Sequence, residues 1–232
     1  MSEGILSQDE IDALLGAGEA GVEKRPGGSG GEPDGMGAFA AGDVGEVLRV
    51  AVEAGIEALA DYLGTSGSAE AGALRPGLFG EMLAAVGGEQ VAVDMEFEGE
   101  LGGGALLLFP REAAAAIGAL ALGGDASGAA GEAGLGGLRT ALAEVATQFS
   151  AALTTILMAD VTVRMGEPVP VDCSSEADRP STWAAGEEVV RQAFHVVLGT
   201  AAFDAYVFVP RFVAEELSAV LARQEVEEKE EI

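Results

Sequence analysis

A short line of polar residues around a single acid is the part of this sequence best suited to form a site. Thr140, Glu144, Thr147 and Ala151 follow one another at spacings of four, three and four residues. Residues three and four apart lie on one face of an α-helix, so these side chains would form a narrow stripe. The stripe could present a site built from a carboxylate and hydroxyl groups, or it could be the solvated face of a plain surface helix.

The segment Leu138–Met158 would position this stripe, because it carries the longest uninterrupted helical pattern in the sequence. Its apolar residues recur at helical spacing and make a wide stripe of their own. These apolar residues are Leu138, Leu142, Val145, Phe149, Leu153, Ile156 and Leu157. We expect the helix to bury this apolar face and to expose the polar line.

One sequence pattern occurs twice along the chain. GALLLFPREAAAAIGALAL matches DAYVFVPRFVAEELSAVLA in pattern, and EVLRVAVEAGIEAL matches EVATQFSAALTTIL. The two Pro-Arg pairs within them, 110–111 and 210–211, lie one hundred residues apart. We interpret this as an internal duplication of helix, strand hairpin and helix. Two such halves predict one α/β (α+β) domain with pseudo-two-fold symmetry, in which two long helices lie side by side beside a mixed or antiparallel sheet.

Local patterns predict the individual elements of this domain. Helices are expected at 44–63, 110–122, 138–158 and 210–222, and a short helix is compatible with 78–86. Strands are expected at 91–97, 105–109, 161–165, 189–198 and 201–209. A linker of small residues precedes position 138, and an acidic loop with proline spans about 172–188.

The composition limits the classes of function. The 232 residues suffice for one large domain or two small ones. Twelve basic and 39 acidic residues give a net charge of −27, which argues against nucleic acid or an anionic membrane as partner. The single cysteine, Cys173, excludes an internal disulfide, and the single histidine, His195, argues against a His-based metal site or a Ser-His-Asp triad. No metal and no cofactor are therefore expected.

The sequence shows no targeting or phosphate-binding signal. Its first residues lack a basic region followed by an apolar run, and apolar stretches are broken before the ~18 residues that a spanning helix needs. The glycine runs at 27–31, 102–104 and 123–124 lack the Walker lysine. We expect a cytoplasmic protein with no membrane insertion.

Residues 5–15, ILSQDEIDALL, form a separate candidate for partner binding. Ser7 and Glu10 make a capping box, and Leu6 and Ile11 can make a hydrophobic staple. A helix this short is marginal alone in water and would order on a partner, as helix-in-groove ligands do. The alternative is a frayed tail with no role. The residues expected to contact the partner are Ile5, Leu6, Ser7, Asp9, Glu10, Ile11, Asp12, Leu14 and Leu15.

These observations predict a modular organisation. Residues 1–16 form the partner-binding helical peptide, and the glycine-rich residues 17–42 form a flexible linker. Residues 43–224 form the duplicated domain, and 225–232 form an acidic tail. The linker would keep the peptide at high effective concentration around the domain.

The peptide resembles the N-terminal peptide of flagellar motor switch proteins of the FliM and FliY type, and the duplicated domain resembles the CheC, CheX and FliY domain. The combination resembles the FliY–CheC family, without the C-terminal FliN-like domain that FliY proteins usually carry. The resemblance implies that the peptide binds a phosphorylated CheY-type response regulator. It also implies flagellar switch proteins as further partners and a location at the flagellar basal body.

The resemblance also implies roles for the polar stripe. In active members of the family, each long helix carries an acid or serine, a glutamate four residues later, and an asparagine three after that. The asparagine orients a water for attack on the regulator's aspartyl phosphate, and the glutamate binds the regulator's lysine. The corresponding residues here are Thr140, Glu144 and Thr147 in the second helix and Gly42, Glu46 and Arg49 in the first.

Neither helix has the asparagine at its place. A threonine hydroxyl is shorter than the amide, and an arginine has no acceptor. Gln148 is adjacent to Thr147, but one residue along a helix is about a hundred degrees of rotation, so it should point elsewhere. The leading hypothesis is an adaptor that binds the phosphorylated regulator without hydrolysing it. The alternatives are a CheY-phosphate phosphatase with a degenerate site at Glu144, Thr147, Thr140 and Glu46, and a buffer for the regulator with no motor contact.

Overall fold

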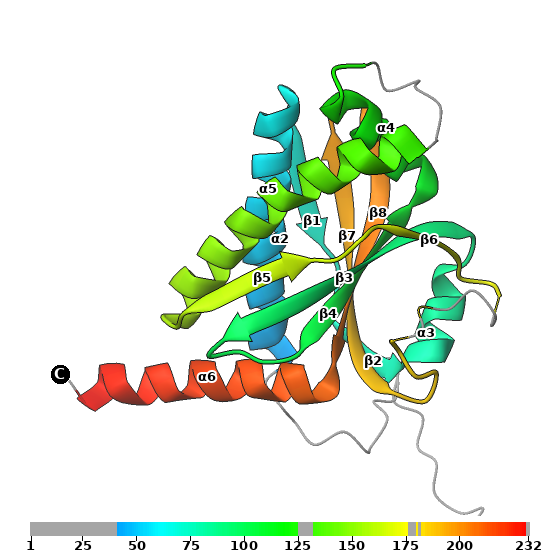
Figure 1. Ribbon diagram of the computed structural model, residues 1–232. Coiled ribbons are helices and arrows are strands. Elements are labelled where there is room, and N and C mark those ends of the chain that lie inside the picture. The colour runs from blue at the N-terminus through cyan, green and yellow to red at the C-terminus, as the bar shows by residue number, and fades with distance from the viewer. Residues whose placement is uncertain (1–40, 125–131, 176–179, 181, 231–232) are drawn as a thin grey trace, which may run out of the picture. The chain divides into compact units, whose positions relative to one another are not determined.

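The computed structural model describes residues 41–124, 132–175, 180 and 182–230. In these ranges the chain forms five helices around a curled sheet of eight strands (Figure 1). The helices are α2 (Ala41–Leu63), α3 (Phe79–Val86), α4 (Arg111–Ala121), α5 (Glu132–Leu157) and α6 (Arg211–Glu230). The strands are β1 (Gly67–Ala71), β2 (Arg75–Leu78), β3 (Glu89–Gly99), β4 (Gly104–Pro110), β5 (Val161–Met165), β6 (Val169–Asp172), β7 (Glu188–Leu198) and β8 (Ala201–Pro210).

The sheet is formed by an exchange between the two halves of the chain. Its strand order is β1-β7-β8-β4-β3-β5, with β2 also paired to β7 and β6 to β3. The short strands of each half therefore pair with the long hairpin of the other half, while β4 and β8 pair at the centre. This arrangement confirms the duplicated pseudo-two-fold domain. The sequence predicted a mixed or an antiparallel sheet, and the sheet is antiparallel.

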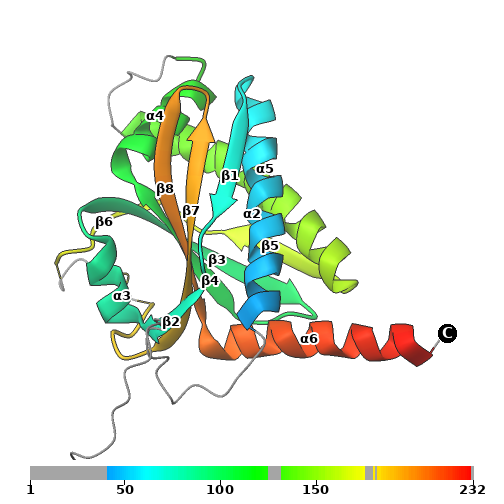
Figure 2. The same ribbon diagram turned by 180° about the vertical axis from the view of Figure 1, so that it is seen from behind.

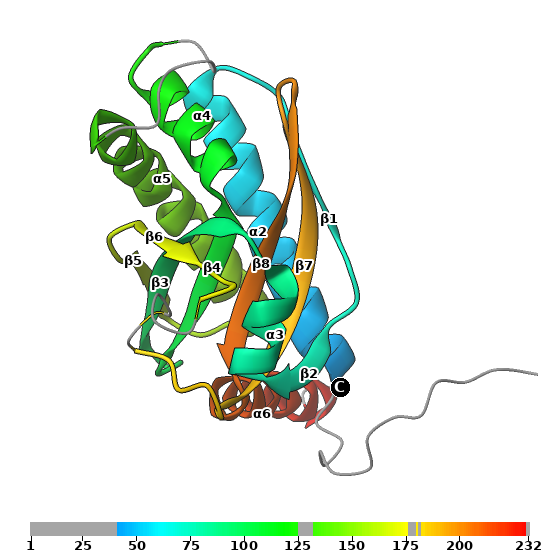
Figure 3. The same ribbon diagram turned by 90° about the vertical axis from the view of Figure 1, so that its right-hand side faces the viewer.

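The two faces of the sheet carry separate cores. On one face the sheet packs against α2, α4, α5 and α6, around residues such as Phe97, Phe149 and Phe194. On the other face α3 and the acidic loop cover a smaller core that contains Phe79 and Phe208. Figure 3 shows α2, α4 and α5 on one side of the sheet and α3 on the other. The long helices α2 and α5 lie side by side, as predicted.

The apolar stripe of the long helix is buried as expected. All of its residues are buried except Ile156, which is partly buried. The helix is longer than predicted, since it begins at Glu132 rather than near 138. One glycine of the expected linker, Gly137, has a packing role, because a Cβ on it would overlap the carbonyl oxygen of Gly118 in α4. A Cβ on Gly118 would in turn overlap the carbonyl oxygen of Gly134 in α5. Helix α6 is also longer than predicted and lies across one end of the sheet (Figure 2).

Three short strands, β1, β2 and β6, were not predicted from the sequence. Their segments GSAEA, RPGL and VPVD are short and contain glycine, proline or acidic residues, which are poor strand formers. They become strands because each pairs with a long strand of the opposite half. The acidic loop begins where β6 ends, at Asp172, and its described residues before β7 are irregular.

The two Pro-Arg pairs make equivalent contacts in both halves. Arg111 pairs with Glu89 at 3.4 Å, and Arg211 pairs with Glu188 at 2.7 Å. Each glutamate is the first residue of the first strand of its hairpin. The duplication thus extends from the order of elements to an ion pair that links the start of each hairpin to the helix that follows it.

Two expectations concern the ends of the chain and the membrane. The predicted regulator-binding peptide, residues 5–15, lies outside the described residues, as does most of the predicted linker. Among the helices described here, none is long and apolar enough to cross a membrane.

Candidate functional site

The structure places the polar line of α5 on an exposed face of that helix. Thr140, Glu144, Thr147 and Ala151 are all exposed, as the spacing predicted. Gln148 is also exposed, one position further round the helix. The geometry agrees with a presented surface; the roles of the individual residues remain predictions.

Both threonine hydroxyls of this line are bound to their own helix. Thr140 Oγ1 donates to the carbonyl oxygen of Gly136 at 3.3 Å, and Thr147 Oγ1 donates to that of Ala143 at 3.0 Å. A hydroxyl has only one hydrogen to donate, so each oxygen retains only acceptor capacity towards solvent. Thr147 therefore lacks the paired donor and acceptor that an asparagine amide would offer to a water.

Glu144 lies between the two threonines with its carboxylate exposed to solvent. Within the described ranges it forms no hydrogen bond and no ion pair. Its charge is thus available to a cationic side chain from outside the chain. This is the interaction that the resemblance implies for a regulator lysine.

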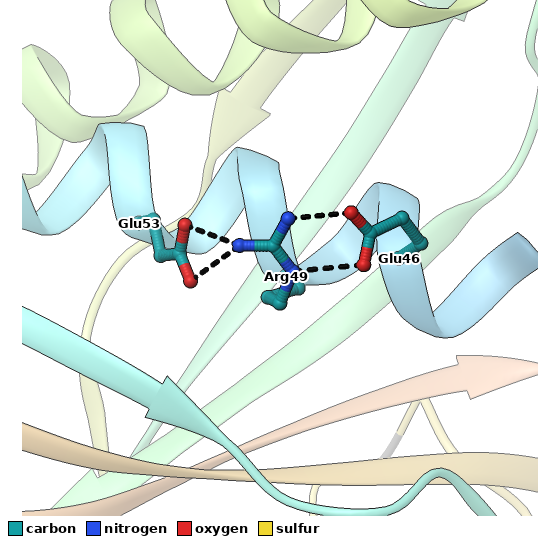
Figure 4. A network of polar contacts seen from close by, with 3 residues as sticks. All are labelled: Glu46, Arg49 and Glu53. Atoms are coloured by element: carbon teal, nitrogen blue, oxygen red, sulfur yellow. Dashed lines mark hydrogen bonds and ion pairs between the residues drawn. The ribbon is translucent and has the colours of Figure 1, made fainter. Parts of the chain in front are cut away.

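The corresponding glutamate of α2 is engaged. Figure 4 shows Arg49 between Glu46 and Glu53, each one helical turn away. Arg49 donates through Nε and Nη2 to the two oxygens of Glu46, at 2.8 and 2.5 Å. Its Nη1 donates to Glu53 at 2.7 and 2.6 Å. The guanidinium fork is shared between two carboxylates, an arrangement that charge-assisted hydrogen bonds favour.

The ionisation of this cluster follows from the same contacts. The hydrogen bond from Arg49 lowers the pKa of Glu46 below its usual value, and the positive charge of Arg49 adds to the effect. The hydrogen bonds to Glu46 and Glu53 raise the pKa of Arg49. Glu46 is therefore ionised at neutral pH, but a partner's cation would have to displace Arg49 to reach it.

The two candidate half-sites lie on adjacent helices but are in different states. A Cβ on Gly55 of α2 would lie 3.0 Å from Cγ1 of Val145 in α5, so the glycine permits the close approach of the helices. The α5 half-site offers a glutamate that no described residue pairs with, whereas the α2 half-site holds its glutamate in an ion pair with Arg49. The duplicated sequence positions have thus diverged in their electrostatics.

A groove of about 560 Å³ borders the α5 half-site, between α5 and β5. Thr147 and Ser150 line its helical wall, and Arg139 and Arg164 lie along it. Ser150 closes the base of the groove, since its hydroxyl accepts a hydrogen bond from the Val163 amide at 2.8 Å. Because β5 is an edge strand, this contact occupies a backbone donor that would otherwise be free to pair with another strand.

Sequence reasoning missed two residues of this region. Glu53 completes the Arg49 cluster, and the four-residue spacing from Arg49 to Glu53 was a usable signal for it. Ser150 carried no such signal, because its partner on β5 is set by the packing of the helix against the strand.

The other candidates have local structural roles. Trp183 of the acidic loop is held in place locally, since its Nε1 donates to Asp94 at 3.0 Å and its ring lies 5.1 Å from that of Phe79. His195 is exposed on the inner strand β7, with Nδ1 2.9 Å from Asp204. Across the part of the chain that the structure describes, no group of three His, Cys, Asp or Glu residues could hold a metal ion.

Comparison with solved structures identifies the fold. FliY from Thermotoga maritima superposes with a TM-score of 0.70 at 16% identity, covering 79% of this chain and 96% of that one. FliM from H. pylori, in structures of its complexes with SpeE and with FliG, gives TM-scores of 0.60 and 0.59 at 12% identity. These matches cover 79% and 75% of this chain and 96% of each FliM chain.

The described chain therefore has the FliY and FliM middle-domain fold, as the resemblance implied. No protein-family model matches the sequence, and no curated protein matches it. At these identities the likeness establishes the fold alone.

Proposed function

We propose that this protein is an adaptor of the chemotaxis and flagellar switch system. Its N-terminal helix, residues 1–16, binds the phosphorylated form of a CheY-type response regulator and is tethered by residues 17–42 to the duplicated domain. The domain provides a second, weaker contact through Glu144. The protein acts in the cytoplasm, at the flagellar basal body.

The observation that carries the proposal is the state of the two half-sites. Glu144 is exposed and unpaired among the described residues, so it is able to bind a lysine of a partner. The hydroxyl proton of Thr147 is directed to Ala143, and Glu46 is held by Arg49. The domain therefore retains a binding group while neither helix has an amide at the water-orienting position, which favours binding without hydrolysis.

The shared fold supports the choice of system. The FliY and FliM structures cover most of the described domain. The FliM protein from H. pylori has been crystallised with FliG and with SpeE. Flagellar switch proteins are accordingly the first further partners to test for this chain, by co-purification, which also separates the adaptor from a buffer with no motor contact.

Deletion of residues 1–15 tests the proposed role of the peptide. The full chain should bind a phosphorylated CheY-type regulator more tightly than the unphosphorylated form, and the deletion should abolish that difference. Binding can be measured by titration calorimetry with a stable phosphate mimic on the regulator. Undiminished, phosphorylation-dependent binding by the shortened chain would remove the proposal.

A phosphatase is the second candidate, favoured by the position of Glu144 one turn from Thr147 at the edge of a groove. In that case Glu144→Ala should slow a measurable dephosphorylation of the regulator, while Glu53→Ala, on the other helix, should not. Equal decay rates with and without the protein would exclude this function.

A further inference from the structure

Two arginines oppose each other on the sheet, and no carboxylate of the described residues pairs with either of them. Arg75 of β2 is the register partner of Arg191 of β7. Directly opposed residues of an antiparallel ladder project from the same face, and like charges in that arrangement are destabilising. Among the described residues, neither arginine forms an ion pair.

Most of the described arginines pair with a carboxylate of the described chain, but Arg75, Arg191 and Arg223 do not. The described arginines that have a carboxylate partner are Arg49, Arg111, Arg139, Arg164 and Arg211. Arg223, on α6, donates to the carbonyl oxygen of Ala219. In a chain with 39 acidic residues and a net charge of −27, carboxylates are abundant, so two opposed arginines without one call for a different explanation.

Arg191 is held in place by contacts that leave most of its donors unused. The side chain is half-buried, and Nη1 donates to the carbonyl oxygen of Met82 in α3 at 3.3 Å. The guanidinium carbon lies 5.5 Å from the centre of the Tyr206 ring, in range for a cation–π contact. Burial lowers the pKa of Arg191, and the charge of Arg75 adds to this effect. The group is thus an ordered, incompletely solvated cation beside an exposed one.

We propose that Arg75 and Arg191 form a binding site for an oxyanion, a phosphate or a carboxylate group. A planar guanidinium presents paired N–H donors that match both groups, and a bound anion would remove the repulsion between the two arginines. The site lies on the α3 face of the sheet, whereas α2 and α5 cover the opposite face. It is therefore separate from the Glu144 region and does not depend on the adaptor function.

The test is a titration of the full chain with inorganic phosphate and, separately, with acetate, at an ionic strength held constant with sodium chloride. Calorimetry should show saturable binding of one anion at one site, and the anion that binds identifies the ligand group. Arg191→Gln and Arg75→Gln should each weaken that binding by about tenfold or more, the usual worth of a hydrogen bond to a charged group. Arg191→Lys should weaken it as well, because the planar fork is lost.

Arg223→Gln is the matched control, since it removes the same charge from an exposed arginine on α6, and it should leave anion binding unchanged. If Arg191→Gln fails to fold, the exposed Arg75→Gln carries the test. The absence of a saturable response to both anions would overturn the proposal. Equal weakening by Arg223→Gln would also overturn it, because the effect would then reflect net charge and not a site.

Discussion

At the residue scale, the side chain one helical turn after each glutamate decides what that glutamate can do. Arg49 follows Glu46 and binds its carboxylate, whereas Thr147 follows Glu144 and binds a backbone carbonyl. The two halves share a pattern, yet one glutamate is satisfied within the chain and the other is open to a partner. Substitution at position 49 or 147 should therefore change what Glu46 or Glu144 can bind.

The Glu46–Arg49 contact predicts a pH dependence of stability. The pKa of Glu46 is lower in the folded protein than its usual 4.5, so the stabilisation is present above pH 4.5 and is lost as the pH falls through the folded value. Glu46→Gln should thus lower the midpoint of thermal unfolding slightly at pH 7, and the difference should shrink steadily below pH 4.5. Glu144→Gln is the control. A difference that grows in acid would contradict the assigned contact.

Thr147→Asn should give the protein phosphatase activity. The change places an amide where the resemblance implies a water-orienting group, three residues after the open Glu144. Because such chemistry depends steeply on placement, we expect the regulator's phosphate to decay at least about tenfold faster than with the wild type. Gln148→Asn, turned about a hundred degrees round the helix, should have no effect. If Thr147→Asn binds the regulator but leaves its decay unchanged, the assignment of position 147 is wrong.

At the element scale, packing decides where local sequence signals fail. The hairpins and long helices could be predicted, because Val91–Phe97 alternates with period two and Leu138–Leu157 repeats with helical spacing. The segments GSAEA and RPGL could not, because only pairing with β7 makes them strands. The exposed polar face of α5 followed from its periodicity. The ion pair between Glu46 and Arg49 could not be predicted with the same certainty. Their spacing permits it, but the side-chain conformation of Arg49 decides whether it forms.

Glycines where α4 meets the start of α5 allow a sharp test of helix packing. Gly118→Ala would place a methyl group against the Gly134 carbonyl and should destabilise the protein by about 1–3 kcal/mol. Gly136→Ala is the matched control: a Cβ there meets nothing within 4 Å, so the change should be neutral or stabilise by about 0.5–1 kcal/mol. Urea unfolding measures both. Equal effects would mean that α4 and α5 do not pack as described.

At the scale of the whole molecule, the exchange of short strands joins the halves into one domain. β1 and β2 complete the sheet beside β7, and β5 and β6 complete it beside β3. The two long helices, α2 and α5, therefore lie in a fixed relation on one face of the sheet. Glu46 of α2 is bound by Arg49, and Glu144 of α5 is exposed to solvent. Such a domain is suited to present a single asymmetric contact surface, and in the proposed function the N-terminal peptide would add affinity through its tether.

The central claim, binding without hydrolysis, is tested most directly by following the decay of a phosphorylated CheY-type regulator with and without the full chain, alongside its binding. We predict clear, phosphorylation-dependent binding and an unchanged decay rate. Faster decay that Glu144→Ala removes would contradict the claim and establish the phosphatase instead. If the chain neither binds the regulator nor speeds its decay, the fold serves a different partner.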